Sequence, residues 1–124
     1  MSDKLDQFAA KKYLNLESFR KSGKAVATPV WFAEDDGELF IYSLADAGKV
    51  KRIRNNPRVR IVPCDMRGKP EGEWIEARAR ILAGAEADKA NLLLIRKYGL
   101  LKRIGNLFSK LMNRKRDVIS IRPD

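Results

Sequence analysis

Histidine is absent from the 124-residue chain, and cysteine occurs once, as Cys64. Without histidine the chain lacks the Ser–His and Cys–His pairs of many hydrolases, and the commonest general base near neutral pH. One cysteine forms no intramolecular disulfide, and without histidine it leaves no ligand set for zinc or an iron–sulfur cluster. We therefore predict no metal site and do not expect a hydrolase.

Long apolar runs are also missing. No run approaches the ~20 residues that a membrane-spanning helix needs, and residues 1–6 contain acidic residues in place of the apolar stretch of a signal peptide. We therefore expect a cytoplasmic protein without a transmembrane segment. The length and the 44% hydrophobic content suit one domain, residues 1–124, and there is no repeat or linker that would divide it.

Positive charge is abundant. The chain has 26 Lys and Arg against 16 Asp and Glu, a formal net charge of +10. The resulting field favours anionic partners, among them phosphates, polyacids, nucleic acids and acidic lipids. Net charge alone does not choose among them.

The first half of the chain has turn signals between short apolar runs. Residues 5–13 have the spacing of a short N-terminal helix. The β-branched and aromatic run 25–33 is interrupted by Glu34-Asp35-Asp36-Gly37 and resumes at 39–42, which predicts a β-hairpin. Pro29 cannot donate to a strand ladder, so this strand should have an edge, a bulge or a bend there.

The second half continues the pattern. Runs 59–65, 74–82 and 118–121 predict further strands, and in the middle one Glu76, Arg78 and Arg80 share one face. Helices are expected over 49–55, 86–98 and 100–112. About six strands with two or three peripheral helices predict a small, mainly β, antiparallel barrel.

The most informative segment is the loop from Ser43 to Gly48 that leads into Lys49. Unpaired backbone N–H groups and the positive end of the dipole lie at a helix start, and Lys51 and Arg52 add full charge. These features suit a phosphate-binding site. On the pattern alone, however, an exposed basic helix without a ligand is the better-supported interpretation, since charge runs usually face solvent.

Several segments together resemble the pyridoxamine-phosphate-oxidase-like split-barrel family. They are Thr28-Pro29-Val30-Trp31-Phe32, Tyr42-Ser43, Ala47-Gly48-Lys49-Val50-Lys51-Arg52, Asn56-Pro57-Arg58-Val59 and Pro63-Cys64-Asp65-Met66-Arg67-Gly68. Their order and spacing match over most of the chain. Within the superfamily the sequence is most similar to the short deazaflavin-dependent branch, whose members have a TPVWF-like strand and a GK-x-x-R segment.

The resemblance implies a six-stranded antiparallel split β-barrel that forms a homodimer, with FMN or the deazaflavin coenzyme F420 in grooves at the dimer interface. It assigns Lys49 to the cofactor phosphate, Ala47 and Gly48 to backbone contacts, and Lys51 and Arg52 to additional charge. The residues it implies for cofactor binding are Thr28, Pro29 and Trp31 along the ring, Ser43 near the phosphate or ribityl chain, and Ala47, Gly48, Lys49, Lys51 and Arg52.

Two positions depart from the oxidase branch. Ala47 stands where a phosphate-binding Ser is common, and Gly48 where an Arg is common, so oxidation of pyridoxamine phosphate is not expected. The positive net charge fits coenzyme F420, with its acidic tail, better than FMN. We predict an oxidoreductase that transfers hydride from reduced F420, or alternatively FMN, to an unidentified small organic substrate.

No catalytic residue is assigned, because the hydride chemistry belongs to the cofactor ring. Tyr42, Tyr98 or Cys64 could donate a proton, but core or interface packing explains each of them more simply.

Three alternatives differ in class. The protein could bind a flavin or deazaflavin without turnover, which the sequence does not separate from an enzyme. Nucleic-acid binding through exposed arginines lacks any recognised motif, so we predict no nucleic-acid partner. Peripheral membrane contact through the amphipathic stretch 100–112 stays possible, although covering the barrel or a dimer partner is the simpler use of its apolar side.

Overall fold

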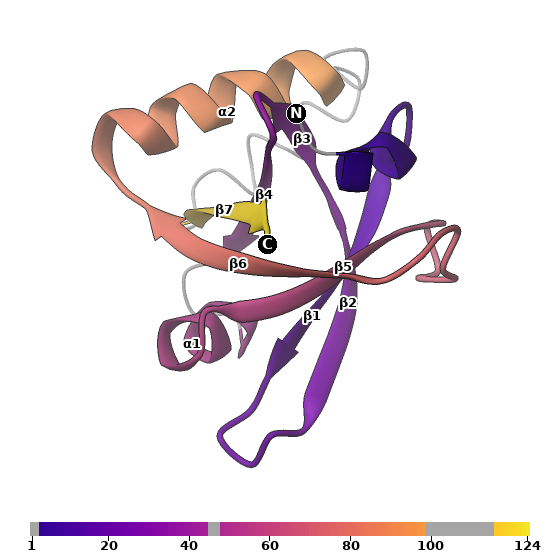
Figure 1. The fold of residues 1–124 in the computed structure, drawn as a ribbon. Helices are drawn as coiled ribbons and strands as arrows, with labels where there is room; N and C mark the ends of the chain where they lie inside the picture. The colour runs from indigo at the N-terminus through magenta and orange to yellow at the C-terminus, as the bar shows by residue number, and fades with distance from the viewer. Residues whose placement is uncertain (1–2, 45–47, 99–115) are drawn as a thin grey trace.

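One antiparallel sheet organises the molecule (Figure 1). The computed structural model describes residues 3–44, 48–98 and 116–124. The sheet has the strand order β2-β1-β5-β6-β7-β4-β3. Its strands are β1 (Tyr13–Phe19), β2 (Ala25–Trp31), β3 (Ala33–Asp35), β4 (Glu38–Leu44), β5 (Arg58–Cys64), β6 (Ile75–Leu82) and β7 (Arg116–Pro123). The helices are the 3₁₀-helix η1 (Asp3–Phe8), α1 (Gly48–Asn55) and α2 (Gly84–Tyr98).

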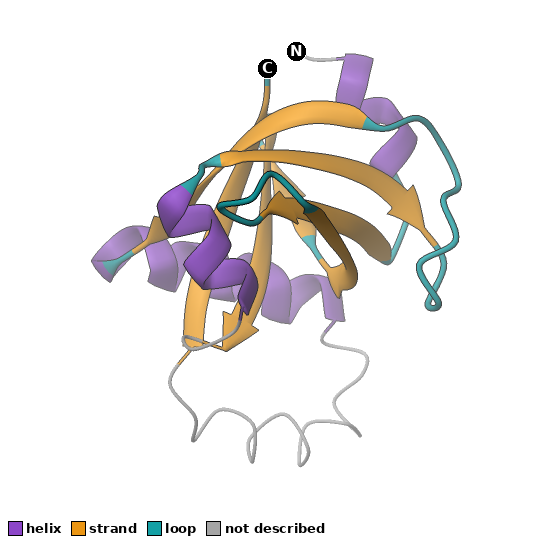
Figure 2. Ribbon diagram, turned by 90° about the horizontal axis from the view of Figure 1, so that it is seen from below, coloured by secondary structure: helices purple, strands orange, loops and turns teal. Residues whose placement is uncertain are grey.

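The predicted fold class is confirmed: the chain is mainly β, and its antiparallel sheet curls into a split barrel. Figure 2 shows the strands curving around a shared interior. The barrel is not closed, because β2 and β3 are the two edge strands and do not pair with each other. The described residues contain seven strands where about six were expected: the run 25–33 divides at Phe32 into β2 and the short β3, and no run in the sequence predicted β1.

The predicted hairpin is only partly correct. β2 pairs with β1, with Thr28 opposite Leu16, whereas β3 alone forms the hairpin with β4. The turn between β3 and β4 is Asp36-Gly37, where φ is 51° and 77°. Positive φ at both central residues matches the twist of the flanking strands, and Asp-Gly is a favoured pair for such a two-residue turn.

The N-terminal helix prediction was wrong beyond Phe8. Leu5 and Phe8 are buried as expected of its apolar side, but Tyr13 begins β1. Sequence periodicity missed β1 because this strand lies between β2 and β5, and its five central residues are buried irrespective of polarity. Asn15, for example, is buried and donates from Nδ2 to the backbone carbonyl of Gly68 over 2.6 Å.

The other predicted elements are confirmed where they are described. In β6, Ala77 and Ala79 are buried, whereas Glu76, Arg78 and Arg80 are exposed, as the alternation predicts. α2 ends at Tyr98, close to the predicted limit. The predicted helix over 100–112 lies outside the described residues.

Apolar side chains form two clusters on the two sides of the sheet. The larger cluster fills the barrel interior and includes Leu14, Ile41, Ile61, Ile119 and Ile121. The smaller one lies under α2 and joins Ala33, Phe40, Leu82, Ala90, Leu94 and Val118. α1 is anchored to the larger cluster, so its start has a defined position at the far end of the barrel from α2 (Figure 1).

Candidate functional site

The start of α1 carries the best candidate site. Val50 and Ile53 are buried and attach the helix to the barrel interior, which positions the residues before and between them. Lys49 is half-buried at the first turn, and no acidic side chain occupies that turn. Unpaired N–H groups and a cationic side chain therefore come together at the positive end of the helix dipole.

Arg52 lies over this helix start. Its Nε donates to the Oγ of Ser18 over 2.6 Å, and Ser18, near the end of β1, is fully buried. A Cβ atom added to Gly48 would lie 2.8 Å from Nη1 of Arg52. Glycine at position 48 thus leaves room for the guanidinium beside the helix N-terminus.

Arg20 supplies a third cation, two residues beyond Ser18. The turn that carries it is held by the Arg20 N–H, which donates to the Lys24 carbonyl over 2.9 Å. Burial, and to a smaller degree the charge of Arg20, lowers the pKa of Arg52. We call Arg20, Lys49 and Arg52 the basic cluster.

The basic cluster is electrostatically unbalanced. Burial lowers the pKa of Lys49, and the neighbouring charge of Arg52 lowers it further. None of the three cations forms an ion pair with a carboxylate in the part of the chain that the structure describes. A bound anion would relieve both the repulsion and the loss of hydration.

The residues that were predicted to bind the cofactor phosphate do not all lie at the helix start. Gly48, Lys49 and Arg52 lie together at the helix start, as described above. Lys51 is exposed, two residues and therefore about half a turn away from Lys49. Ser43 is buried near the end of β4, and Ala47 lies outside the described residues.

The predicted ring-contacting residues lie on the edge strand β2. Thr28 points to the opposite side of the strand from Pro29 and Trp31, because side chains alternate. Its Oγ1 is buried and has no hydrogen-bond partner among the described residues. Pro29 is exposed, and Trp31 packs against the cluster under α2.

Sequence reasoning missed Ser18 and Arg20, because β1 itself was missed. Their spacing, Ser-x-Arg at the end of a strand and before a Gly23 turn, was the available signal. Only the folded chain shows that this strand end meets the start of α1, which follows it by about thirty residues.

A phosphorylated ring cofactor fits these residues on two observations of the structure. The basic cluster offers a cationic helix start that has no carboxylate partner within 3–44, 48–98 and 116–124, which suits a phosphate. Thr28 offers a buried hydroxyl without a partner in these same ranges, and such groups ordinarily have one. The hydroxyl suits a polar edge of a ligand on that side of β2.

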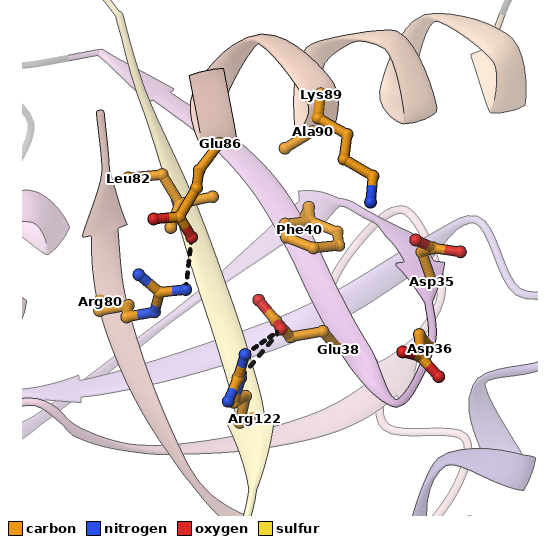
Figure 3. A pocket seen from close by; sticks show the side chains of 10 residues that line it. All are labelled: Asp35, Asp36, Glu38, Phe40, Arg80, Leu82, Glu86, Lys89, Ala90 and Arg122. Carbon is orange, nitrogen blue, oxygen red and sulfur yellow. Dashed lines mark hydrogen bonds and ion pairs between the residues drawn. The ribbon is translucent and has the colours of Figure 1, made fainter. Parts of the chain in front are cut away.

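Two further hollows lie on the face of the sheet that α2 partly covers. One is a pocket of about 190 Å³ beside the β3–β4 turn, shown in Figure 3. Arg80 pairs there with Glu86 at 2.7 Å, and Arg122 pairs with Glu38 at 2.6 Å. Glu38 also accepts a hydrogen bond from the Ser120 hydroxyl. Neither hollow includes a residue of the basic cluster.

The described ranges, 3–44, 48–98 and 116–124, contain neither a metal-binding group of side chains nor a membrane-spanning helix. No group of three His, Cys, Asp or Glu side chains there is arranged to hold a metal ion. No helix in these ranges has the length and apolarity to cross a membrane.

The fold is that of a split-barrel domain, and the basic cluster gives it a cationic helix start. The model of the pyridoxamine 5'-phosphate oxidase family matches residues 1–124, and the chain belongs to that family. No curated protein sequence matches the chain significantly.

Solved structures support the fold at low sequence identity. An F420 reductase is 18% identical, with a TM-score of 0.62 over 100% of this chain and 95% of its own. An FAD-binding protein from Mesorhizobium loti is 16% identical, with a TM-score of 0.67 over 100% and 91%. The heme storage protein HutZ from Vibrio cholerae is 14% identical, with a TM-score of 0.68 over 93% and 83%.

Proposed function

We propose that the chain binds a phosphorylated flavin or deazaflavin, with the phosphate at the basic cluster, and acts as an oxidoreductase. The observation that carries this proposal is the meeting of Lys49, Arg52 and Arg20 at a helix start without a carboxylate partner among the described residues. Family membership supports the oxidoreductase part of the proposal, because the family is described as that of an oxidase.

Each residue has a separate task in this proposal. Lys49 and the α1 N–H groups neutralise and orient the phosphate, and Ser18 holds the Arg52 guanidinium in place. Thr28 contacts a polar edge of the ring system from β2. The bound cofactor would supply hydride transfer, while the protein supplies position and shields the ring from water.

Coenzyme F420 is the cofactor we favour over FMN. The net charge of +10 suits a ligand with more negative charge than one phosphate. The structural similarity to an F420 reductase agrees with this choice, although similarity to an FAD-binding protein supports flavins equally well. The substrate of the reaction is a small organic molecule of unassigned class.

We further propose that two copies complete the cofactor site. β2, which carries Thr28, Pro29 and Trp31, is an edge strand with one side unpaired in the sheet. A second copy against this edge would cover the ring and exclude water from it. Sedimentation of the purified protein with and without cofactor tests the dimer directly.

The decisive experiment is a parallel titration with FMN and oxidised F420, followed by ligand fluorescence at moderate salt. We expect F420 to bind more tightly, and Lys49→Ala to weaken binding by about tenfold or more as a charge-assisted contact is lost. Lys51→Ala is the matched control, since it removes the same charge from the exposed side of the same helix. Equal losses in the two variants would show that only net charge matters, and no binding by the wild type would refute the proposal.

A cofactor-binding protein without turnover is the second candidate. The similarity to HutZ, a heme storage protein, shows that this fold is not restricted to enzymes. Oxidation of reduced F420 in the presence of candidate acceptors separates the two functions. Tight binding without acceptor-dependent oxidation across a broad screen would favour the carrier.

A further inference from the structure

Three arginines face one another across neighbouring strands on the outer side of the sheet. Arg58 of β5 is the register partner of Arg78 of β6, and Arg78 is in turn the partner of Arg122 of β7. We call these residues the arginine row. Like charges directly opposite each other on neighbouring strands are destabilising, so this arrangement calls for compensation.

The arginines at the two ends of the row each pair with a carboxylate, whereas the middle arginine has no such partner among the described residues. Arg58 pairs with Asp124 at 3.5 Å, and Arg122 pairs with Glu38 at 2.6 Å. Arg78 is exposed and has no carboxylate partner or side-chain hydrogen bond among residues 3–44, 48–98 and 116–124. Glu76, two residues earlier on the same face, is opposite Arg60.

A groove of about 340 Å³ lies beside the unpaired guanidinium. Its lining combines the cations Arg78, Arg80 and Arg122 with apolar surface from Pro57 and Pro123. This volume is in the range of small-molecule sites. Asp124 is the one carboxylate among the described residues that line the groove.

The cations at the edge of the groove are held in place. Figure 3 shows Arg80 and Arg122 on adjacent strands, each tied to a carboxylate on the side facing α2 and the β3–β4 turn. A guanidinium has five N–H donors, so one carboxylate leaves donors free for a second oxyanion. Preorganised donors bind an anion with less loss of side-chain freedom.

We propose that this groove is a second anion site, which binds a small molecule with at least two carboxylate or phosphate groups. One group would bind Arg78, and the other would bind either Arg122, one strand spacing away on β7, or Arg80, two residues further along β6. The site shares no residue with the basic cluster, so the proposal does not depend on the cofactor assignment.

Calorimetric titration of the full chain at low salt tests the proposal, with citrate and pyrophosphate as separate probes and inorganic phosphate as the probe with one group. With the basic cluster disabled in the Lys49→Ala variant, we expect one molecule of citrate or pyrophosphate per chain, bound more tightly than phosphate. The stronger of the two identifies the carboxylate or the phosphate class. Arg78→Ala should weaken this binding by about tenfold, and Arg78→Glu should abolish it.

Two control variants test whether the loss of citrate or pyrophosphate binding is specific to Arg78. Arg67→Ala removes an exposed arginine from the turn after β5 and should leave the affinity unchanged. Lys49→Ala should leave it unchanged as well, while reducing F420 or FMN binding. Thermal unfolding of each variant checks that it is folded. Loss of citrate or pyrophosphate binding in Lys49→Ala but not in Arg78→Ala would overturn this proposal and leave the cofactor proposal standing, and failure of the wild type to bind either probe would also overturn it.

Discussion

Inside the barrel, Ile41, Ile61 and Ile119 are fully buried among apolar neighbours, whereas at the start of α1 three cations approach one another without a carboxylate partner among the described residues. Burial of apolar side chains in the first region stabilises the folded protein. The second keeps a partly buried lysine beside an arginine, and the two positive charges repel each other in the free protein. The difference is typical of a binding site, where complementarity to a ligand is kept at the expense of stability.

The largest effect should come from the interior. Ile119→Ala removes a fully buried side chain and leaves a cavity that the close-packed barrel fills only in part, so the free energy of unfolding should fall by about 2–5 kcal/mol. Urea denaturation measures the change. Leu92→Ala on α2, where the side chain is 58% exposed, is the control and should change stability by less than about 0.5 kcal/mol. Similar losses in the two variants would contradict the burial assigned to the interior.

Paired charges should give an intermediate effect. Burial raises the pKa of Glu38, but hydrogen bonds from Ser120 and Arg122 outweigh it and bring the pKa below its ordinary value. A carboxylate with a lowered folded pKa stabilises the protein above its unfolded pKa, and this contribution is lost as pH falls through the folded pKa. Glu38→Gln should therefore cost about 1 kcal/mol at pH 7, and progressively less as pH falls below the ordinary pKa of a glutamate.

Denaturation at pH 7 and at pH 3.5 measures that difference. Glu86→Gln is the control, because this carboxylate pairs with Arg80 in full contact with solvent and should have a smaller effect. A loss in Glu38→Gln of the same size at pH 3.5 as at pH 7 would mean that packing, and not charge, explains the contribution of Glu38.

In the basic cluster, removing a charge should raise the free energy of unfolding instead of lowering it. Lys49→Met removes a partly buried charge beside Arg52 and should stabilise the cofactor-free protein by about 0.5–1 kcal/mol, while it weakens phosphate-dependent binding by about tenfold or more. Lys51→Met, on the exposed side of α1, should change neither quantity appreciably. Destabilisation by Lys49→Met would contradict this contrast between the interior and the basic cluster, because the lysine would then stabilise the folded protein.

The smallest effect concerns Lys97, whose ammonium lies 3.6 Å from the centroid of the Phe32 ring. Burial lowers its pKa to about 8, with the charge of Glu34 opposing the shift. The folded protein therefore releases this proton before the unfolded chain does, so stability should rise between about pH 8 and pH 10.5. Lys97→Met should lack this rise in denaturation midpoints measured at pH 7.5 and 9.5, and an identical pH profile in both proteins would contradict the assignment.

Much of the fold could be predicted from local pattern. Alternation in β6 separated Ala77 and Ala79 from Arg78 and Arg80, and the Asp36-Gly37 pair marked a tight turn. The strand β1 could not be found in this way. Its polar residues are buried and its neighbours are distant in sequence, so no period-two pattern marks it.

The candidate site was predictable in part. Lys49 and Arg52 follow from the basic segment and from the family resemblance, whereas Ser18 and Arg20 depended on the missed strand. The arginine row is invisible in the sequence, because its members are 20 and 44 residues apart and meet only through the register of β5, β6 and β7.

The sequence by itself determined the mainly β class, the positive charge and the helix start at Lys49, because each depends on composition or on neighbours within a few residues. Tertiary structure alone decided which cations share a site and which are neutralised by a carboxylate. The physical reason is that electrostatic interaction depends on distance and burial in the folded chain, and antiparallel pairing brings together residues that no local pattern relates.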